Sequence, residues 1–171
     1  VPSLRELLAD QAQLLMSDAL AVREGLYPPM DDDAASPFGH LARVRAMFAD
    51  LPEAFARRTD KDATTVKTQA AAADVPDYYA QDFHFQTGGY LSDESARLYD
   101  AQVETLFYGA AGAMRRAGLA YIARHMYGRD QRHTEMIDVA CGTGRFLREI
   151  RSAYPAMRLK GLDLSKSYLE E

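Results

Sequence analysis

The apolar side chains near the N-terminus recur with the period of an amphipathic helix. Ser3 and Glu6 have the spacing of a capping box, in which each side chain accepts from the backbone of the other residue. Apolar residues follow every three or four positions, which predicts a helix from about Ser3 to Glu24. The prolines of YPPMDDD (Tyr27 to Asp33) end it, because proline cannot continue a helix. The expected apolar face consists of Leu4, Leu8, Ala12, Leu15, Ala19 and Val22.

Helical patterns continue as far as residue 130. Ser36 and Pro37 are typical of a helix start, and an apolar stripe follows them. Residues 59–75 are polar and rich in alanine, which fits either a surface helix or a linker. Ser92 is a good N-cap for a longer helical pattern that runs to about Tyr127.

That longer pattern contains glycines that predict where it is interrupted and where it ends. Gly109 and Gly112 predict a break or kink, because glycine destabilises a helix interior. Gly128 is placed to form the C-cap. The expected apolar face comprises Tyr99, Val103, Leu106, Ala110, Met114 and Ile122.

Beyond residue 130 the pattern changes to strand, helix and strand. EMIDVA is a short apolar run before a glycine loop, typical of a buried parallel strand, and MRLKGLDL predicts a second strand. Between them GRFLREIRSAY predicts a helix, and Ser165 is the N-cap of another. A helix that connects two neighbouring strands makes them parallel, so an α/β fold is expected. The apolar face of the connecting helix consists of Phe146, Leu147, Ile150 and Tyr154.

The composition is that of a globular chain, with 47% apolar and 26% charged residues among 171. A net charge of −5 and scattered Lys and Arg argue against general binding to nucleic acid or an anionic membrane. No apolar run is long enough to span a membrane, and the N-terminus lacks a signal-peptide pattern. Cys141 is the only cysteine, which fits a reducing compartment and gives the expectation of a cytoplasmic location. The four histidines show no ligand spacing, so no metal site is expected.

A glycine-rich turn stands between the first strand and its helix, and such a turn exposes backbone amides to a ligand. Dinucleotides prefer G-x-G-x-x-G at this place, with an acidic residue about 20 positions further on. Gly142 and Gly144 supply the first two glycines, but Leu147 stands at the third position. The bulky leucine disfavours the dinucleotide fingerprint.

DVACGTG followed by GLDLS resembles the class I S-adenosylmethionine-dependent methyltransferases. Motif I of that family has an acidic residue at the end of strand one and then a G-x-G-x-G loop, and Ala140 stands in place of its first glycine. An ordinary negative φ is expected for Ala140. The resemblance covers about the last 35 residues of the chain. The residues that it implies for cofactor binding are Asp138, Ala140, Cys141, Gly142, Thr143, Gly144, Asp163 and Leu164.

The resemblance implies S-adenosylmethionine as the cofactor and a role for each end of the site. The amides of Gly142 to Gly144 suit the carboxylate of the cofactor, and Asp138 suits its ammonium group. Asp163 has two acceptor oxygens for the ribose hydroxyls, and Leu164 would face the adenine. The implied reaction is in-line methyl transfer to a small-molecule acceptor, in which positioning dominates. No catalytic residue is identified.

An aromatic segment before Gly88 and Gly89 has two interpretations. His84, Gln86 and Tyr90 either pack a helical cap against the sheet or form a lid or acceptor pocket over the cofactor. The packing interpretation is favoured.

The chain is expected to comprise a helical region (residues 1–130) and the start of a Rossmann-like domain (residues 131–171). Only two strands are encoded, so the chain is expected to be truncated after the second strand and inactive alone. An open strand edge favours self-association. Two alternatives stay open: a helical interaction module with a vestigial cofactor fold, and an NAD(P)-dependent enzyme.

Overall fold

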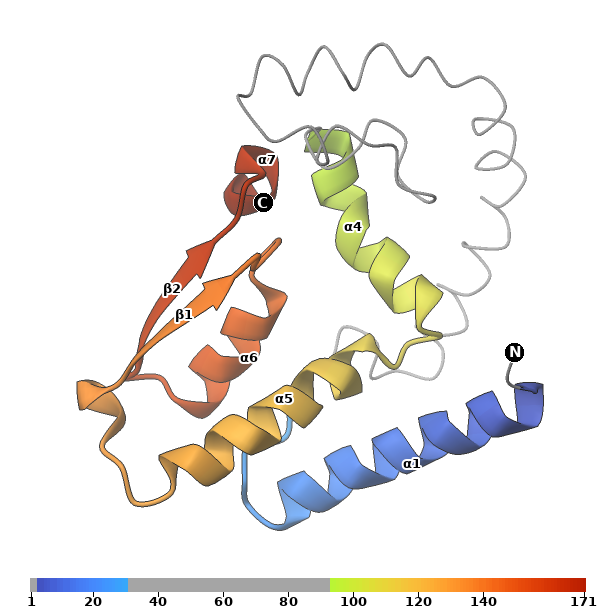
Figure 1. Cartoon of the computed structure of the whole chain (residues 1–171), viewed down its shortest axis with the longest axis horizontal. Coiled ribbons are helices and arrows are strands. Elements are labelled where there is room, and N and C mark those ends of the chain that lie inside the picture. Colours follow the sequence, from blue (N-terminus) through green and yellow to red (C-terminus); the bar gives the residue numbers. More distant parts are fainter. Residues whose placement is uncertain (1–2, 31–92) are drawn as a thin grey trace.

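The computed structural model describes residues 3–30 and 93–171 and has a mostly helical α/β architecture (Figure 1). A two-stranded parallel sheet lies on one side of the molecule and helices lie on the other. The elements in chain order are α1 (Leu4–Arg23), α4 (Asp93–Leu106), α5 (Ala111–Met126), the 3-10 helix η3 (Gln131–His133), β1 (Glu135–Val139), α6 (Arg145–Ala153), β2 (Arg158–Leu162) and α7 (Lys166–Glu170).

Helix α1 begins at the predicted capping box. The Ser3 Oγ accepts from the Glu6 amide at 3.3 Å, and the Ser3 amide donates to Glu6 Oε2 at 2.7 Å. Such a cap contributes about 1 kcal/mol to helix stability. The same carboxylate–amide bond holds the pKa of Glu6 below its ordinary value. The predicted helix is confirmed to within one residue at each end.

The predicted apolar face of α1 is wrong as a buried face. Leu8 is 57% exposed and Leu15 is 47% exposed, whereas Ala21 is buried. The side of α1 that packs on α5 is instead marked by Asp18, which forms an ion pair with Arg116 of α5. Because a charged residue lies at the centre of the contact, a count of apolar positions alone selects the wrong face.

The break predicted near Gly109 is confirmed, and it separates α4 from α5. Tyr108 and Gly109 both have left-handed backbones, with φ of 51° and 79°. The two helices therefore have independent faces. The single apolar face predicted across the break is wrong at Leu106, which is 49% exposed, and at Met114, which is 45% exposed, whereas Ala110 is buried as predicted. Gly128, with φ of 71°, follows the C-cap residue Tyr127 directly.

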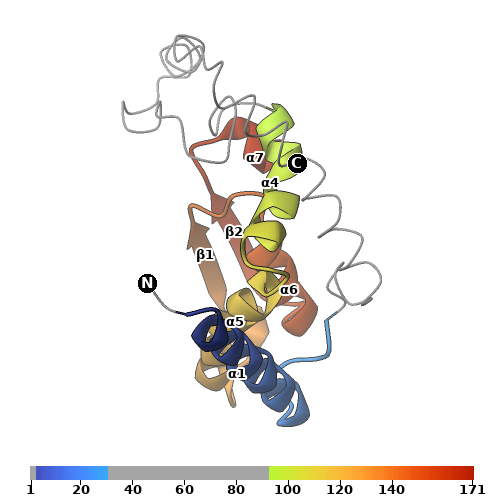
Figure 2. The ribbon, with the colours of Figure 1, turned by 90° about the vertical axis from the view of Figure 1, so that its right-hand side faces the viewer.

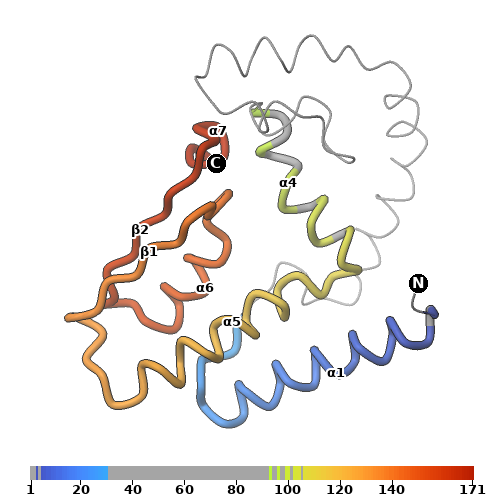
Figure 3. Tube along the Cα trace, in the orientation of Figure 1, coloured from blue at the N-terminus to red at the C-terminus, as the bar shows by residue number. Residues whose placement is uncertain are grey.

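Helix α5 is the centre of the core. Figure 3 shows α1 beside it on one side and α6 on the other, in agreement with the contacts between these helices. Ile150 of α6 and Leu119 of α5 have no exposed surface, which confirms the predicted inner face of α6. The buried core cluster consists of Ala21, Tyr27, Leu119, Ala120, Met126, Ile150 and Met157.

The strands pair in parallel, as predicted, with Asp138 opposite Gly161. Helix α6 covers one face of the sheet, and no described helix covers the other (Figures 1 and 2). On that uncovered face Ile137 is 52% exposed, Val139 74% and Leu162 54%. Both strands end near α4 and α7, which places those two helices at the carboxyl end of the sheet.

Several predicted features lie outside the described residues. These are the second helix start at Ser36 and Pro37, residues 59–75, and the N-cap Ser92. No helix in residues 3–30 or 93–171 is long and apolar enough to cross a membrane.

Candidate functional site

The predicted site residues that the structure describes come together at the carboxyl end of the sheet. The loop of residues 140–144 connects β1 to α6, and Asp163 follows the neighbouring strand β2. In open α/β sheets, ligands bind at this end of the strands. Asp138 is the next-to-last residue of β1. It lies beside the loop, on the face of the sheet that α6 covers.

Three residues of the loop have a left-handed backbone: Ala140 (φ 65°), Gly142 (φ 57°) and Gly144 (φ 73°). The negative φ expected for Ala140 is therefore wrong. The amides of Ala140 and Cys141 both donate to the carbonyl oxygen of Leu162, at 2.7 and 3.0 Å. These two bonds force the chain to turn at Ala140. The left-handed backbone conformation costs an L-residue about 1–2 kcal/mol, whereas glycine adopts it without that cost.

The loop packs tightly against β2 at a residue without a side chain. A Cβ at Gly161 would lie 2.7 Å from Cys141 Sγ and 2.9 Å from Leu147 Cδ1. The Cys141 side chain thus faces the strand. Burial, followed by the charges of Asp163 and Asp138, raises the pKa of the Cys141 thiol, so it stays protonated at neutral pH. This favours a packing role for Cys141.

Asp163 holds the glycine loop from the neighbouring strand. Its Oδ2 accepts from the amide of Gly142 at 2.8 Å, and its Oδ1 accepts from the amide of Ser165 at 2.9 Å. The amide of Gly144 donates to the Cys141 carbonyl. The Thr143 amide, between these two, has no acceptor within the described part of the chain.

Asp138 is the other carboxylate of the site. Burial, and then the negative charge of Asp163, raise the pKa of Asp138 above its ordinary value. No hydrogen bond to the Asp138 side chain forms among residues 3–30 and 93–171. Two nearby carboxylates, one of them partly desolvated, favour a cation between or beside them.

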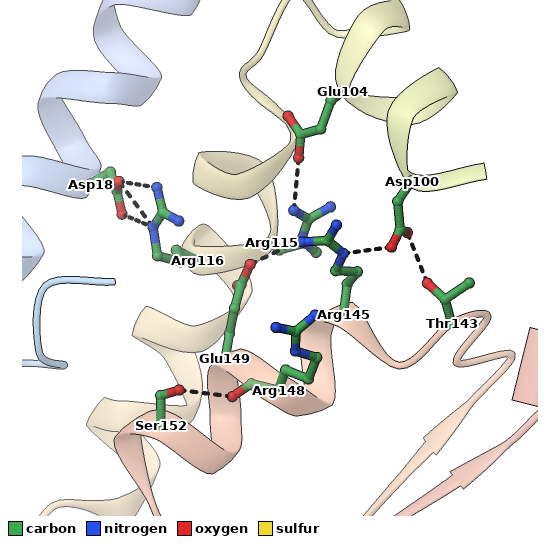
Figure 4. A network of polar contacts seen from close by, with 10 residues as sticks. All are labelled: Asp18, Asp100, Glu104, Arg115, Arg116, Thr143, Arg145, Arg148, Glu149 and Ser152. Atoms are coloured by element: carbon green, nitrogen blue, oxygen red, sulfur yellow. Dashed lines mark hydrogen bonds and ion pairs between the residues drawn. The ribbon is translucent and has the colours of Figure 1, made fainter. Parts of the chain in front are cut away.

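Helix α4 is fastened to the loop by a residue that the sequence analysis missed. Asp100 accepts from the Thr143 hydroxyl at 2.8 Å and from Arg145 Nε at 2.5 Å (Figure 4). Asp100 lies 43 positions before Thr143, and an Asp in an amphipathic helix is ordinarily solvated. No local pattern indicates its partner.

Two tyrosines, also missed, lie against Gly142. A Cβ at Gly142 would be 3.6 Å from Tyr99 Cε1 and 3.9 Å from Tyr168 Cδ1. The two rings are in edge-to-face contact, with centroids 4.9 Å apart at 63°. Tyr168 is buried, and its amide donates to the predicted N-cap Ser165. The sequence predicts Tyr99 on an apolar helix face, and that pattern does not indicate a contact with the loop.

A further arginine joins the three helices behind the loop. Arg115 donates to Glu104 of α4 at 2.9 Å and to Glu149 of α6 at 3.0 Å (Figure 4). With Asp100 and Arg145, this gives α4 two polar attachments to the β1–α6 unit. The position of Tyr99 over the loop is thus fixed by two attachments in the C-terminal half of its helix.

Of the remaining predicted residues, the structure describes Leu164 alone. Leu164 follows Asp163 and is 51% exposed, so its side chain is accessible to a ligand. His84, Gln86 and Tyr90 lie outside the described residues.

The chain matches no protein-family model, no curated protein and no solved structure.

Proposed function

We propose that this chain is a class I S-adenosylmethionine-dependent methyltransferase and that it binds the cofactor at residues 138–144 and 163–164. The observation that carries the proposal is the pairing of Asp163 with the Gly142 amide, beside Asp138, at the ends of two parallel strands. This combines an acidic residue at the carboxyl end of each strand with a left-handed glycine turn after the first strand.

The chemistry of the residues fits the two ends of the cofactor. Asp138 lacks a hydrogen-bond partner in the described residues and suits the ammonium group of the methionyl end. The Thr143 amide and the N-terminus of α6 suit its carboxylate. Asp163 is anchored by backbone amides, so its orientation is set, and a carboxylate oxygen accepts more than one hydrogen bond.

The packing of Leu147 argues against a dinucleotide. In the dinucleotide fingerprint the third glycine allows the helix to approach the strand. Here Leu147 fills that position and Gly161 on β2 provides the space instead. An NAD(P)-dependent enzyme is accordingly disfavoured.

Bound S-adenosylmethionine supplies an activated methyl group for in-line transfer. The described residues of this chain would hold and orient the cofactor, and none is assigned to the chemical step. The acidic net charge of −5 favours a small-molecule acceptor over nucleic acid.

Titration of the ¹⁵N-labelled chain with S-adenosylhomocysteine, followed by NMR, tests the proposal and also measures weak affinities. We expect the amide signals of Thr143, Gly144 and Leu164 to shift, and no such shift with NAD. Asp163→Asn should weaken binding about tenfold or more, because it removes a charged acceptor. Asp130→Asn, at the N-cap of η3 and outside the loop, is the control for the same acid-to-amide change. Shifts with NAD alone, or none in the loop, would contradict the proposal.

A helical interaction module is the second candidate, because α1 exposes a row of large apolar side chains. Leu7, Leu8, Leu15 and Met16 are between 47% and 62% exposed. The same titration separates the two functions: such a module would bind neither S-adenosylhomocysteine nor NAD.

A further inference from the structure

Tyr99 lies against Gly142, in the loop at which the proposed cofactor would approach the backbone. The ring is 3.6 Å from the position of a Cβ at Gly142, which is ordinary van der Waals contact. Gly142 is also the residue whose amide Asp163 holds. The aromatic ring and the carboxylate therefore border the same loop residue.

The Tyr99 ring is held in place by its neighbours. The edge-to-face contact with Tyr168 ties it to α7, whose N-cap Ser165 donates its amide to Asp163. The adjacent Asp100 ties α4 to Thr143 and Arg145. A ring fixed in this way loses little conformational freedom when a ligand binds.

The charges around the loop favour a cation next to this ring. Asp138 and Asp163 are both acidic, and the guanidinium of Arg145 is paired with Asp100. Aromatic rings attract cations at their faces. The methionyl end of S-adenosylmethionine carries two positive centres, an ammonium group and a sulfonium.

We propose that Tyr99 recognises the sulfonium of S-adenosylmethionine and so distinguishes this cofactor from its demethylated product, the neutral thioether S-adenosylhomocysteine. The inference rests on the proposed function, and it assigns the second positive centre of the cofactor to a residue of α4. Asp138 binds the ammonium group, and Tyr99 binds the sulfonium.

Affinities for both compounds, measured by titration calorimetry or NMR on the 171-residue chain, test this assignment. Tyr99→Leu should weaken binding of S-adenosylmethionine roughly fivefold to tenfold and of S-adenosylhomocysteine less than about twofold. Tyr99→Phe keeps the ring and should retain both affinities. Tyr121→Leu is the control, because Tyr121 is 74% exposed on α5. Equal losses for the two compounds, or no loss, would overturn the inference.

A second measurement does not depend on the folding of Tyr99→Leu. In the wild-type chain the S-methyl proton signal of bound S-adenosylmethionine should move upfield, because an aromatic ring shields nuclei above its face. No upfield shift in bound cofactor would overturn the role of Tyr99 and leave the proposed function intact. If the wild-type chain binds neither compound, the proposed function falls, and the role of Tyr99 falls with it.

Discussion

Among residues 3–30 and 93–171, two arginine–aspartate pairs connect helices, and they differ in their surroundings. Arg116 and Asp18 join α5 to α1, with side chains 7% and 15% exposed. Arg145 and Asp100 join the start of α6, next to the glycine loop, to α4, with side chains 30% and 26% exposed. The first pair lies in the core, and the second lies at the candidate site, within reach of water.

The difference in burial gives the two pairs different roles. The Asp18 carboxylate also accepts from the Tyr27 hydroxyl at 2.8 Å, and burial together with this bond raises the pKa of Tyr27. Removal of one member of such a buried network leaves a charge without compensation. A pair that water reaches contributes less to stability, because water partly replaces a lost partner. The core pair therefore stabilises the fold, and the loop pair positions the site.

The largest expected effect comes from Arg116→Ala. We expect a loss of about 3 kcal/mol in the free energy of unfolding, because Asp18 remains buried without its cation. Urea unfolding followed by circular dichroism measures the loss. The matched control is Arg145→Ala, which should cost less than about 1 kcal/mol. Equal losses for the two variants would remove the distinction between the pairs.

The next effect, from Gly161→Ala, tests whether packing stabilises the loop more than its ion pair does. The added Cβ would overlap Cys141 Sγ and Leu147 Cδ1, so we expect a loss of about 1–3 kcal/mol. Cys141→Ala removes the nearer atom and should recover about half of the loss in the double variant. An unchanged unfolding midpoint for Gly161→Ala would show that the contact is loose.

The elements themselves follow from the sequence because local interactions determine them. The capping box at Ser3, the break at Gly109 and the N-cap at Ser165 all act within a few residues. The inner face of α6 was also predictable, since Phe146 and Ile150 are apolar and recur with the helical period. The predicted part of the site, from Asp138 to Asp163, consists of residues on one β-α-β unit.

The features that the sequence did not indicate depend on contacts between distant residues. The inner face of α1 is set by Asp18, whose partner lies 98 positions away. Asp100 and Tyr99 reach the loop only because α4 returns to the carboxyl end of the sheet. The backbone of Ala140 is set by a carbonyl of the neighbouring strand, which no property of alanine reveals.

A smaller effect, opposite in sign, is expected for Ala140→Gly. Glycine removes the strain of φ 65° but increases the entropy of the unfolded chain, which leaves a gain of about 0.5–1 kcal/mol. Ala117→Gly is the matched control. It lies exposed within α5 and should lose about 0.5–1 kcal/mol. Losses in both variants would show that the turn at Ala140 is not strained in solution.

The smallest expected change in stability concerns Asp138, which unlike the two paired aspartates has no cation beside it among the described residues. Its pKa is raised in the folded chain, so the folded state holds this proton more tightly than the unfolded state does. As the pH rises from the ordinary value of 3.8 through the raised pKa, the free energy of unfolding decreases.

Asp138→Asn should remove that decrease and raise the melting temperature at neutral pH, while it weakens binding of S-adenosylmethionine. Melting curves between pH 3.5 and 7.5 measure the difference from wild type, with the exposed Asp10→Asn on α1 as control. A gain in stability together with a loss of affinity would show that the Asp138 carboxylate lowers the stability of the fold but is needed to bind the cofactor. Equal melting curves for Asp138→Asn and wild type would show that the carboxylate is fully solvated. Asp138 would then differ from the paired aspartates only in lacking an arginine partner, and not in its effect on stability.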